Sequence, residues 1–374
     1  MQRYVLTLIW NQQADLENIG EWASVNLYYL MLKLINRSTS RIIVGDELCR
    51  SEQWLDTVTK YTENLGMVIL LLRPFPLFMR PFIAKLLPPV YYLRDTLARV
   101  KDDIFVPMIL ARREAEENDP SYEKPDDFMQ WMTETADTEL DEKPENIAHG
   151  LMIIMALAVI HTSTMLITQG LYDLMVHPEY LEPLRREITE TLKNGWANAS
   201  KVELANQTRL DSFLRESQRL NPTSEINVQR IVKDTIIFDD GFMLPSGTHI
   251  SFPAGPLSRD PDLIESPETF DGFRWCRDED CAGDAKSPKP KPKNTGIVNI
   301  GKLNLHFGYG RSACPGRFFA ANTAKAILSR LLLEYDLKFE EGKEGKRPMN
   351  IRNGEQIFAN FFTKVLIKKR GVKA

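Results

Sequence analysis

One cysteine stands in a glycine-rich segment that leads into an apolar stretch. The segment reads His306-Phe-Gly-Tyr-Gly-Arg-Ser-Ala-Cys314-Pro-Gly-Arg-Phe-Phe-Ala320. Because proline suits the first position of a helix, the order Cys-Pro predicts a helix from Cys314 to about Glu334. The N-terminal end of a helix stabilises negative charge through its free N–H groups and its dipole, and so favours a thiolate over a thiol. The pattern therefore indicates that Cys314 is a poised thiolate.

The residues around Cys314 strengthen this interpretation. Gly308, Gly310 and Gly316 remove side chains where the backbone must turn sharply or lie flat against a large planar group. Phe307 can cover the sulfur. A lone cysteine is more often a small buried hydrophobe, but the flanking pattern favours a functional thiolate here.

The pattern Phe-Gly-x-Gly-x-x-x-Cys-x-Gly resembles the haem-binding loop of the cytochrome P450 superfamily of haem-thiolate monooxygenases. The resemblance implies iron protoporphyrin IX as the cofactor and Cys314 as the axial ligand of its iron. A thiolate ligand pushes electron density onto haem iron and promotes O–O cleavage. The implied cofactor-binding residues are Phe307, Gly308, Gly310, Arg311, Gly316 and Arg230.

Two arginines are assigned to the haem propionates by the resemblance. Ser312 occupies a position where the family commonly places a basic residue toward a propionate, and Arg311 beside it is expected to substitute. Arg230 resembles another propionate contact, by its place in the strand after the Glu-x-x-Arg helix. The family's Trp-x-x-x-Arg helix, its first helices and its membrane anchor have no match here.

The resemblance also implies a structural Glu–Arg–Arg cluster. Glu216-Ser-Gln-Arg219 matches the family's Glu-x-x-Arg pair, and Phe270-Asp-Gly-Phe-Arg274-Trp matches the segment that adds a second arginine. A Glu–Arg pair at this spacing is by itself usually a solvated contact that contributes about 0.3 kcal/mol. As a buried cluster, Glu216, Arg219 and Arg274 would hold the haem loop and do no chemistry.

An oxygen-activation motif is expected on a long central helix. Ala158-Val-Ile-His-Thr162-Ser lies where the family places a small residue, glycine, an acid and threonine, so His161 replaces the acid. Outside this context, a histidine after an apolar run is more often a hydrogen-bonded core residue. At this position, Thr162 and His161 are the catalytic candidates that would route protons to the oxygen-activation site.

The subgroup with the strongest resemblance comprises fungal enzymes of secondary metabolism, such as ent-kaurene oxidases and indole-diterpene oxygenases of mycotoxin-type pathways. The resemblance implies oxidation of an apolar, terpenoid or alkaloid-like substrate, with O2 and with electrons from NADPH-cytochrome P450 reductase. It places substrate contacts at Thr223–Val228, at Gln356–Phe361, and near Ala156 and Ile160. It also implies the cytosolic face of the endoplasmic reticulum membrane.

Two alternatives remain at this stage. The first is a truncated, non-catalytic relative that binds haem or a lipid-like ligand. The second is a helical interaction protein without a cofactor. A reduced-CO spectrum separates the second from the others, and substrate-dependent oxygen consumption separates the first from the enzyme.

The expected fold is mainly α with a small β region. Helices are predicted over Asn146 to about Leu174, Glu179–Lys193 and Leu210–Leu220, and hairpins over Ile226–Phe252. Ile357–Lys368 is expected to form terminal strand pairs. The predicted organisation is a single, N-terminally incomplete haem domain over residues 1–374, with residues 1–20 poorly matched and a Lys/Pro loop at 286–293.

Composition excludes little else. A formal net charge of -4 and a pI near 5.9 give no global positive field, so nucleic acid is not an expected partner. Four cysteines are too few for a disulfide framework in a chain of 374 residues. The apolar run Leu151–Ile160 is shorter than the ~20 residues of a membrane span, which predicts a helix buried inside protein.

Overall fold

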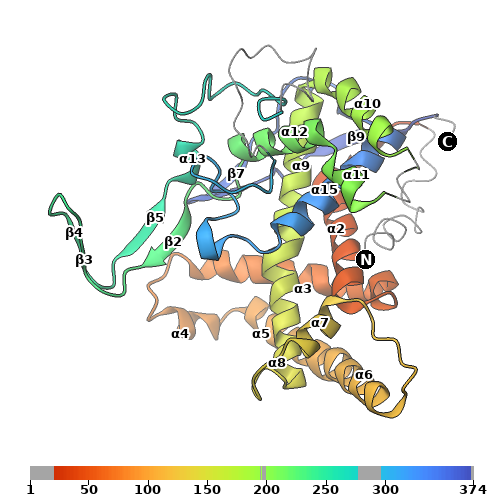
Figure 1. Ribbon diagram of the computed structural model, residues 1–374, viewed down its shortest axis with the longest axis vertical. Helices are drawn as coiled ribbons and strands as arrows, with labels where there is room; N and C mark the ends of the chain where they lie inside the picture. The colour runs from red at the N-terminus through yellow and green to blue at the C-terminus, as the bar shows by residue number, and fades with distance from the viewer. Residues whose placement is uncertain (1–20, 194, 196–198, 277–295, 372–374) are drawn as a thin grey trace. The chain divides into compact units, whose positions relative to one another are not determined.

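The computed structural model describes residues 21–193, 195, 199–276 and 296–371. These residues form two compact units, each described by itself. The first is Leu30–Thr164, and the second joins the residues up to Tyr29 with those from Met165 onward. Residues 1–20, which were expected to be poorly matched, and the predicted Lys/Pro loop at 286–293 lie outside the described residues. The described part of the first unit is helical, and the second unit combines helices with small sheets, which confirms the predicted fold class (Figure 1).

The first unit is built from helices punctuated by proline. Pro88 begins α5, and Ser51 caps α3 by accepting a hydrogen bond from the Trp54 N–H at 3.2 Å. The Trp54 and Phe105 rings pack at 5.6 Å between centroids. The elements are α2 (Leu27–Val44), α3 (Glu52–Leu72), α4 (Arg80–Ala84), α5 (Pro88–Val100), η3 (Lys101–Phe105), α6 (Val106–Asn118), α7 (Phe128–Glu134), α8 (Pro144–Ile153) and η4 (Ile154–Val159).

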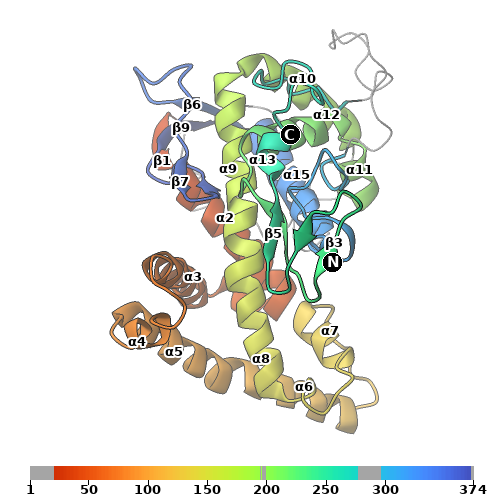
Figure 2. The same ribbon diagram turned by 90° about the vertical axis from the view of Figure 1, so that its left-hand side faces the viewer.

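The predicted central helix is continuous but not uniformly α-helical. Segment α8 continues through the π-helical turn η4 into α9 (Ile160–Val176), so that the three form one continuous helix (Figure 2). Among the described residues, Pro144–Val176 alone has the length and apolar composition of a membrane span, and 56% of its most apolar window is buried by protein. Such burial is typical of a core helix.

The second unit packs α10 (Leu181–Thr191) and α12 (Thr208–Leu220) against α15 (Arg317–Glu334). Leu184, Leu214 and Leu331 are fully buried in this core. Nearly every side chain of α12 from Leu210 onward is buried, including its polar ones, so these polar groups require internal partners. Two short helices, α11 (Lys201–Ala205) and α13 (Ala254–Leu257), lie in the same unit.

Four small antiparallel sheets complete the described part of the second unit. Strand β9 (Lys364–Lys369) lies between β1 (Ala23–Asn26) and β6 (Tyr335–Phe339). The predicted hairpin region forms β2 (Asn227–Ile231) with β5 (His249–Phe252) and β3 (Ile236–Ile237) with β4 (Met243–Leu244). Strand β8 (Gln356–Phe358) pairs with β7 (Ile351–Asn353). The terminal strand pairs expected over Ile357–Lys368 are present: β8 pairs with β7, and β9 pairs with β1 and β6.

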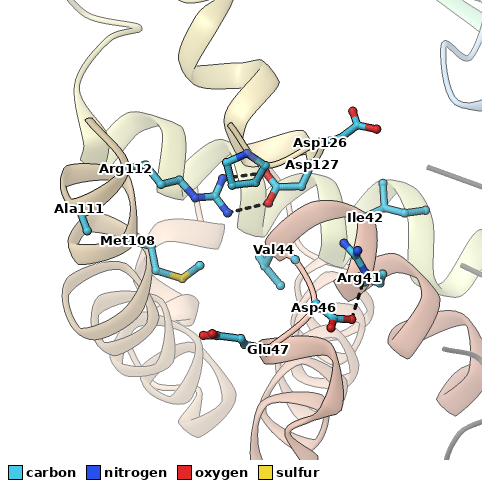
Figure 3. Close-up of a pocket in the computed structure, with 12 residues that line it drawn as sticks. Arg41, Ile42, Val44, Asp46, Glu47, Met108, Ala111, Arg112, Asp126 and Asp127 are labelled. Atoms are coloured by element: carbon cyan, nitrogen blue, oxygen red, sulfur yellow. Dashed lines mark hydrogen bonds and ion pairs between the residues drawn. The ribbon is translucent and has the colours of Figure 1, made fainter. Parts of the chain in front are cut away.

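A pocket of about 540 Å³ opens in the first unit between the end of α2 and helix α6 (Figure 3). Arg112 on its wall binds Asp127 through two hydrogen bonds of 2.8 and 2.6 Å. Arg41 lies 3.3 Å from a carboxylate oxygen of Asp46. Because Arg41 and Arg112 are both paired with carboxylates, neither is free to bind an anion in this pocket.

Candidate functional site

The cysteine loop of the second unit folds back on itself. The Cys314 N–H donates to the Phe307 carbonyl at 2.7 Å, and the Gly308 N–H donates to the Leu305 carbonyl at 2.9 Å. Gly308 has φ +76°, and a Cβ there would lie 2.9 Å from the Ser312 carbonyl oxygen. Gly310 has φ +63° but open space beside it. Glycine at 308 is thus required by both conformation and space, whereas glycine at 310 is required by conformation alone.

Cys314 carries a free, exposed thiol. Helix α15 begins at Arg317, with Gly316 as its N-cap, so the prediction that the helix begins at Cys314 was wrong. Pro315 instead lies in the turn that precedes the helix, directly after the Cys314 N–H group whose hydrogen bond closes the loop. The Cys314 carbonyl accepts a hydrogen bond from the Arg317 guanidinium at 2.8 Å, which ties the turn to the first residue of the helix.

Glu216, Arg219 and Arg274 lie together in the second unit. Glu216 is fully buried, and its Oε2 and Oε1 accept from Arg219 Nε at 2.9 Å and Nη2 at 2.8 Å. Arg274 Nε adds a contact of 3.0 Å to Oε1. The Trp275 indole N–H (2.9 Å) and the Asp271 main-chain N–H (3.1 Å) also donate to this carboxylate. The carboxylate is therefore saturated, as a buried charge must be.

This cluster is connected to the cysteine loop through Ser258 and His306. Arg219 Nη1 donates to the Ser258 carbonyl at 2.7 Å, and the Ser258 hydroxyl lies 3.1 Å from His306 Nε2. From the adjoining sheet, Asn227 donates to the Leu305 carbonyl at 2.8 Å. The loop is thus held from the side of the cluster and from strand β2.

His306 and Asn227 are contacts that sequence reasoning did not find. Burial, with the nearby Arg215, Arg219 and Arg259, lowers the pKa of His306 to about 4. The imidazole is therefore neutral at pH 7. Its position directly before Phe307 was the available signal, but only the fold shows that Ser258 lies beside it.

The two arginines assigned to propionates are both exposed residues of the second unit. Arg311 is in the 3-10 turn Gly310–Ser312, and it is exposed. Arg230 is an exposed residue of β2, and its guanidinium donates to the Gln229 carbonyl at 2.7 Å.

His161 and Thr162 belong to the first unit and follow the π-helical turn η4. The Thr162 hydroxyl is exposed and donates to the Ala158 carbonyl at 2.6 Å. His161 has a hydrogen bond to the main chain of Thr62 in α3, and burial lowers its pKa below the ordinary value of 6.5. π-Turns are rare and occur frequently at functional sites. Ala156 and Ile160, expected near substrate, are buried.

The other two segments expected near substrate lie against each other in the second unit. The Ile357 N–H donates to the Thr223 carbonyl at 3.1 Å, and the Glu225 N–H donates to the Glu355 carbonyl at 2.8 Å. Ser224 and Gln356 form a β-bridge. Main-chain hydrogen bonds therefore join Gln356–Phe358 to Thr223–Glu225, and the two segments form one surface.

Comparison with known proteins gives the family. The sequence model of the cytochrome P450 family matches residues 16–357. The chain is 45% identical over 356 residues to cytochrome P450 monooxygenase paxP of Penicillium paxilli, covering 95% of this chain and 66% of the relative. It is 45% identical over 352 residues to cytochrome P450 monooxygenase penP of Penicillium crustosum, covering 94% of this chain and 65% of the relative. The chain thus spans slightly less than two thirds of the length of these curated relatives.

The fold agrees with this match. The structure of retinoic acid-bound cyanobacterial CYP120A1 has a TM-score of 0.69 and 18% sequence identity, and the match covers 98% of this chain and 74% of that one. At this identity the likeness concerns the fold alone. With the family match over most of the sequence, it shows that the chain belongs to the cytochrome P450 family.

Proposed function

We propose that Cys314 would supply the thiolate that binds the iron of a haem and that the protein is a monooxygenase of apolar substrates. Family membership implies a thiolate-ligated haem. One observation carries the assignment to this residue: Cys314 is a free, exposed thiol at the end of a loop whose turn requires glycine. The other free cysteine among the described residues, Cys49, is fully buried and donates to the Asp46 carbonyl at 3.2 Å.

The loop suits a large planar group. Gly310 and Gly316 place no side chain on its exposed face, and a Cβ at Gly316 would lie 3.9 Å from the Cys314 sulfur. The half-exposed rings of Tyr309 and Phe318 flank the sulfur in sequence and offer apolar surface. Phe307, Gly308 and Cys314 would hold the thiolate end of the site. Bound haem would supply the activation of dioxygen, which protein side chains cannot perform.

The charged contacts fall to exposed arginines. Arg311 and Arg230 would neutralise the propionates, and neither is committed to a carboxylate by a described hydrogen bond or ion pair. Glu216, Arg219 and Arg274 would act as a structural support, because their groups are saturated by one another and by main-chain carbonyls.

Thr162 and His161 would handle protons. The exposed Thr162 hydroxyl can exchange its hydrogen bond to Ala158 for one to water or substrate oxygen. The lowered pKa of His161 leaves the imidazole neutral at pH 7, the form that can both donate and accept.

The substrate class and the electron donor are proposed from the resemblance to the relatives. Cytochrome P450 monooxygenases of Penicillium and Aspergillus share 42 to 45% identity with this chain. They support oxidation of a terpenoid or alkaloid-like molecule in fungal secondary metabolism, with O2 and with electrons from NADPH-cytochrome P450 reductase. The surface formed by Thr223–Val228 and Gln356–Phe361 would contact that substrate.

A membrane surface is the proposed location, on the cytosolic face of the endoplasmic reticulum. Residues 65–94 contain four basic side chains and no acidic one. This segment, drawn in orange in Figure 2, comprises α4 with the adjoining ends of α3 and α5, and large apolar side chains are exposed along it. These are Met67, Ile69, Leu70, Leu71, Phe75, Leu77, Phe78, Met79, Phe82, Leu86 and Tyr91. Exposed apolar groups with basic neighbours suit an anionic lipid surface.

A reduced-minus-CO difference spectrum tests the proposed cofactor site. The wild-type chain should give the red-shifted band of a thiolate-ligated haem. Cys314→Ala should lose this band, while Cys49→Ala should retain it, because the Cys49 thiol is fully buried and bonded to the Asp46 carbonyl. Haem uptake with a thiolate-type band in Cys314→Ala would refute the assignment. Oxygen consumption that depends on an apolar substrate and a reductase then tests the monooxygenase.

A further inference from the structure

A buried polar network in the second unit is not used by the proposed chemistry. Its centre is Asp173 on α9, which is 3% exposed. Asp173 Oδ2 accepts from the Ser217 hydroxyl at 2.5 Å and from the Asn221 amide at 3.2 Å, both on or at the end of α12. Asp173 Oδ1 accepts from Arg347 Nε at 2.5 Å.

Arg347 extends this network into the segment that precedes β7. Its Nη2 donates to Gln169 Oε1 at 2.6 Å, and its Nη1 donates to Asn350 Oδ1 at 3.1 Å. Gln169 Nε2 also donates to Asn350 Oδ1 at 3.0 Å, and Asn350 donates to Asn221 at 2.8 Å. The side-chain contacts therefore form closed rings that join α9, α12 and residues 347–350.

The anchored segment continues directly into the β7–β8 hairpin. Three residues separate Asn350 from Gly354, the turn residue with φ +61°, and β8 follows it. Strand β8 is hydrogen-bonded to Thr223, two residues after Asn221. The network thus anchors both segments of the proposed substrate-contacting surface: Asn221 lies just before Thr223–Glu225, and Asn350 lies just before the β7–β8 hairpin.

We infer that Asp173 and Arg347 are positioning residues that fix the β7–β8 hairpin against Thr223–Glu225 and so set the shape of the substrate site. Neither residue touches the reacting atoms in this assignment. The inference deepens the proposed function and rests on it for the role of the hairpin. A fully satisfied polar network specifies one arrangement, because breaking it strands a buried charge.

Hydrogen exchange tests the hold of the network on the hairpin without requiring haem. Asp173→Asn and Arg347→Lys should speed exchange of the Glu225 and Ile357 amides about tenfold or more, because these hydrogen bonds open locally. Arg347→Lys is included because this side chain is only partly buried, so the variant folds even if Asp173→Asn does not.

Glu187→Gln is the matched control. Glu187 is also a buried carboxylate of the second unit, and it accepts the Arg209 and Leu210 N–H groups at the opposite end of α12. This variant should leave exchange in the hairpin at the wild-type rate. Equal acceleration in Glu187→Gln, or none in the two network variants, would overturn the inference.

Spectral titration of the holoprotein with two azoles tests the effect on the site. Imidazole is small, whereas clotrimazole is bulky and apolar and must contact the walls of the cavity. The network variants should raise the Kd of clotrimazole several-fold and leave that of imidazole unchanged. An unchanged ratio of the two Kd values, despite faster exchange, would overturn the role in shaping the site. No azole shift in the wild type would instead refute the proposed haem site, while the exchange result would still decide the hold on the hairpin.

Discussion

Replacing Glu216 by glutamine exchanges one carboxylate oxygen for an NH2 group and removes the negative charge that balances the buried Arg219 and the partly buried Arg274. The carboxylate accepts hydrogen bonds from Arg219, Arg274, Trp275 and the Asp271 N–H. A glutamine amide keeps one acceptor oxygen and turns an N–H2 group toward two of these donors. Arg219, whose side chain is 2% exposed, then has no compensating charge within the cluster.

The cost follows from this burial. Removing one partner of a buried ion pair destabilises a protein by ~3–5 kcal/mol, against a total stability of roughly 5–15 kcal/mol. For a unit of this size each kcal/mol lowers Tm by about 2–4 °C, so Glu216→Gln should lower Tm by about 10 °C. Circular dichroism during heating measures the shift, and haem content of the purified protein reports whether the cysteine loop is still held.

Glu182→Gln is the control for this prediction, because Glu182 and Arg185 have the same spacing. Arg185 Nη1 lies 2.8 Å from Glu182 Oε1, but the side chain of Glu182 is 77% exposed. An exposed pair contributes about 0.3 kcal/mol, so Tm should fall by about 1 °C. Similar shifts in the two variants would refute the argument that burial, rather than the Glu-x-x-Arg pattern, determines the energy of the cluster.

Three further predictions concern the loop and the central helix. The pKa of His306 is lowered from 6.5 to about 4, so between these two pH values the unfolded chain binds more protons than the folded chain. The contribution of His306 to the free energy of unfolding should be fully present above pH 6.5 and should fall by about 3 kcal/mol toward pH 4. His306→Gln should flatten this part of a series of urea-unfolding measurements at different pH. Gly308→Ala should cost several kcal/mol and abolish haem uptake, since its Cβ would meet the Ser312 carbonyl at 2.9 Å, whereas Gly310→Ala should cost only about 1 kcal/mol for its positive φ; comparable losses of Tm and haem content would contradict the difference in space. Thr162→Val should reduce the share of NADPH electrons recovered in product by roughly tenfold or more, while Thr164→Val, which removes a buried hydroxyl bonded to the Ile160 carbonyl, should not; equal coupling in both variants would remove Thr162 from proton handling.

The features that could be predicted from sequence are those whose geometry is local. Gly308 and Cys314 lie within one loop, and Glu216 and Arg219 lie one helical turn apart, so spacing alone brings each pair together. The long central helix was likewise predicted from its apolar run. Its π-helical turn at Ile154–Val159 was not, because those residues have the same apolar character as the α-helical turns on either side.

Burial was the quantity that the sequence left open. Glu182–Arg185 and Glu216–Arg219 are both Glu-x-x-Arg pairs on helices, yet one carboxylate is exposed and the other inaccessible. The difference arises because the segment around Arg274 covers α12, and that packing is decided by residues more than fifty positions away. The prediction of a buried cluster therefore depended on resemblance and could not come from spacing.

The network around Asp173 shows why the remaining residues had no signal. Gln169 and Asn350 are 181 positions apart, and nothing in either local sequence distinguishes them from surface amides. Their partners are chosen by topology, since α9, α12 and the chain before β7 meet only in the folded unit. A residue that binds a ligand can be predicted from the sequence motif around it. A residue that only positions the site can be identified only from its contacts in the folded protein. If Asp173 and Arg347 act as inferred, variation in substrate among related chains should arise at such buried positions as well as at the residues that contact the substrate.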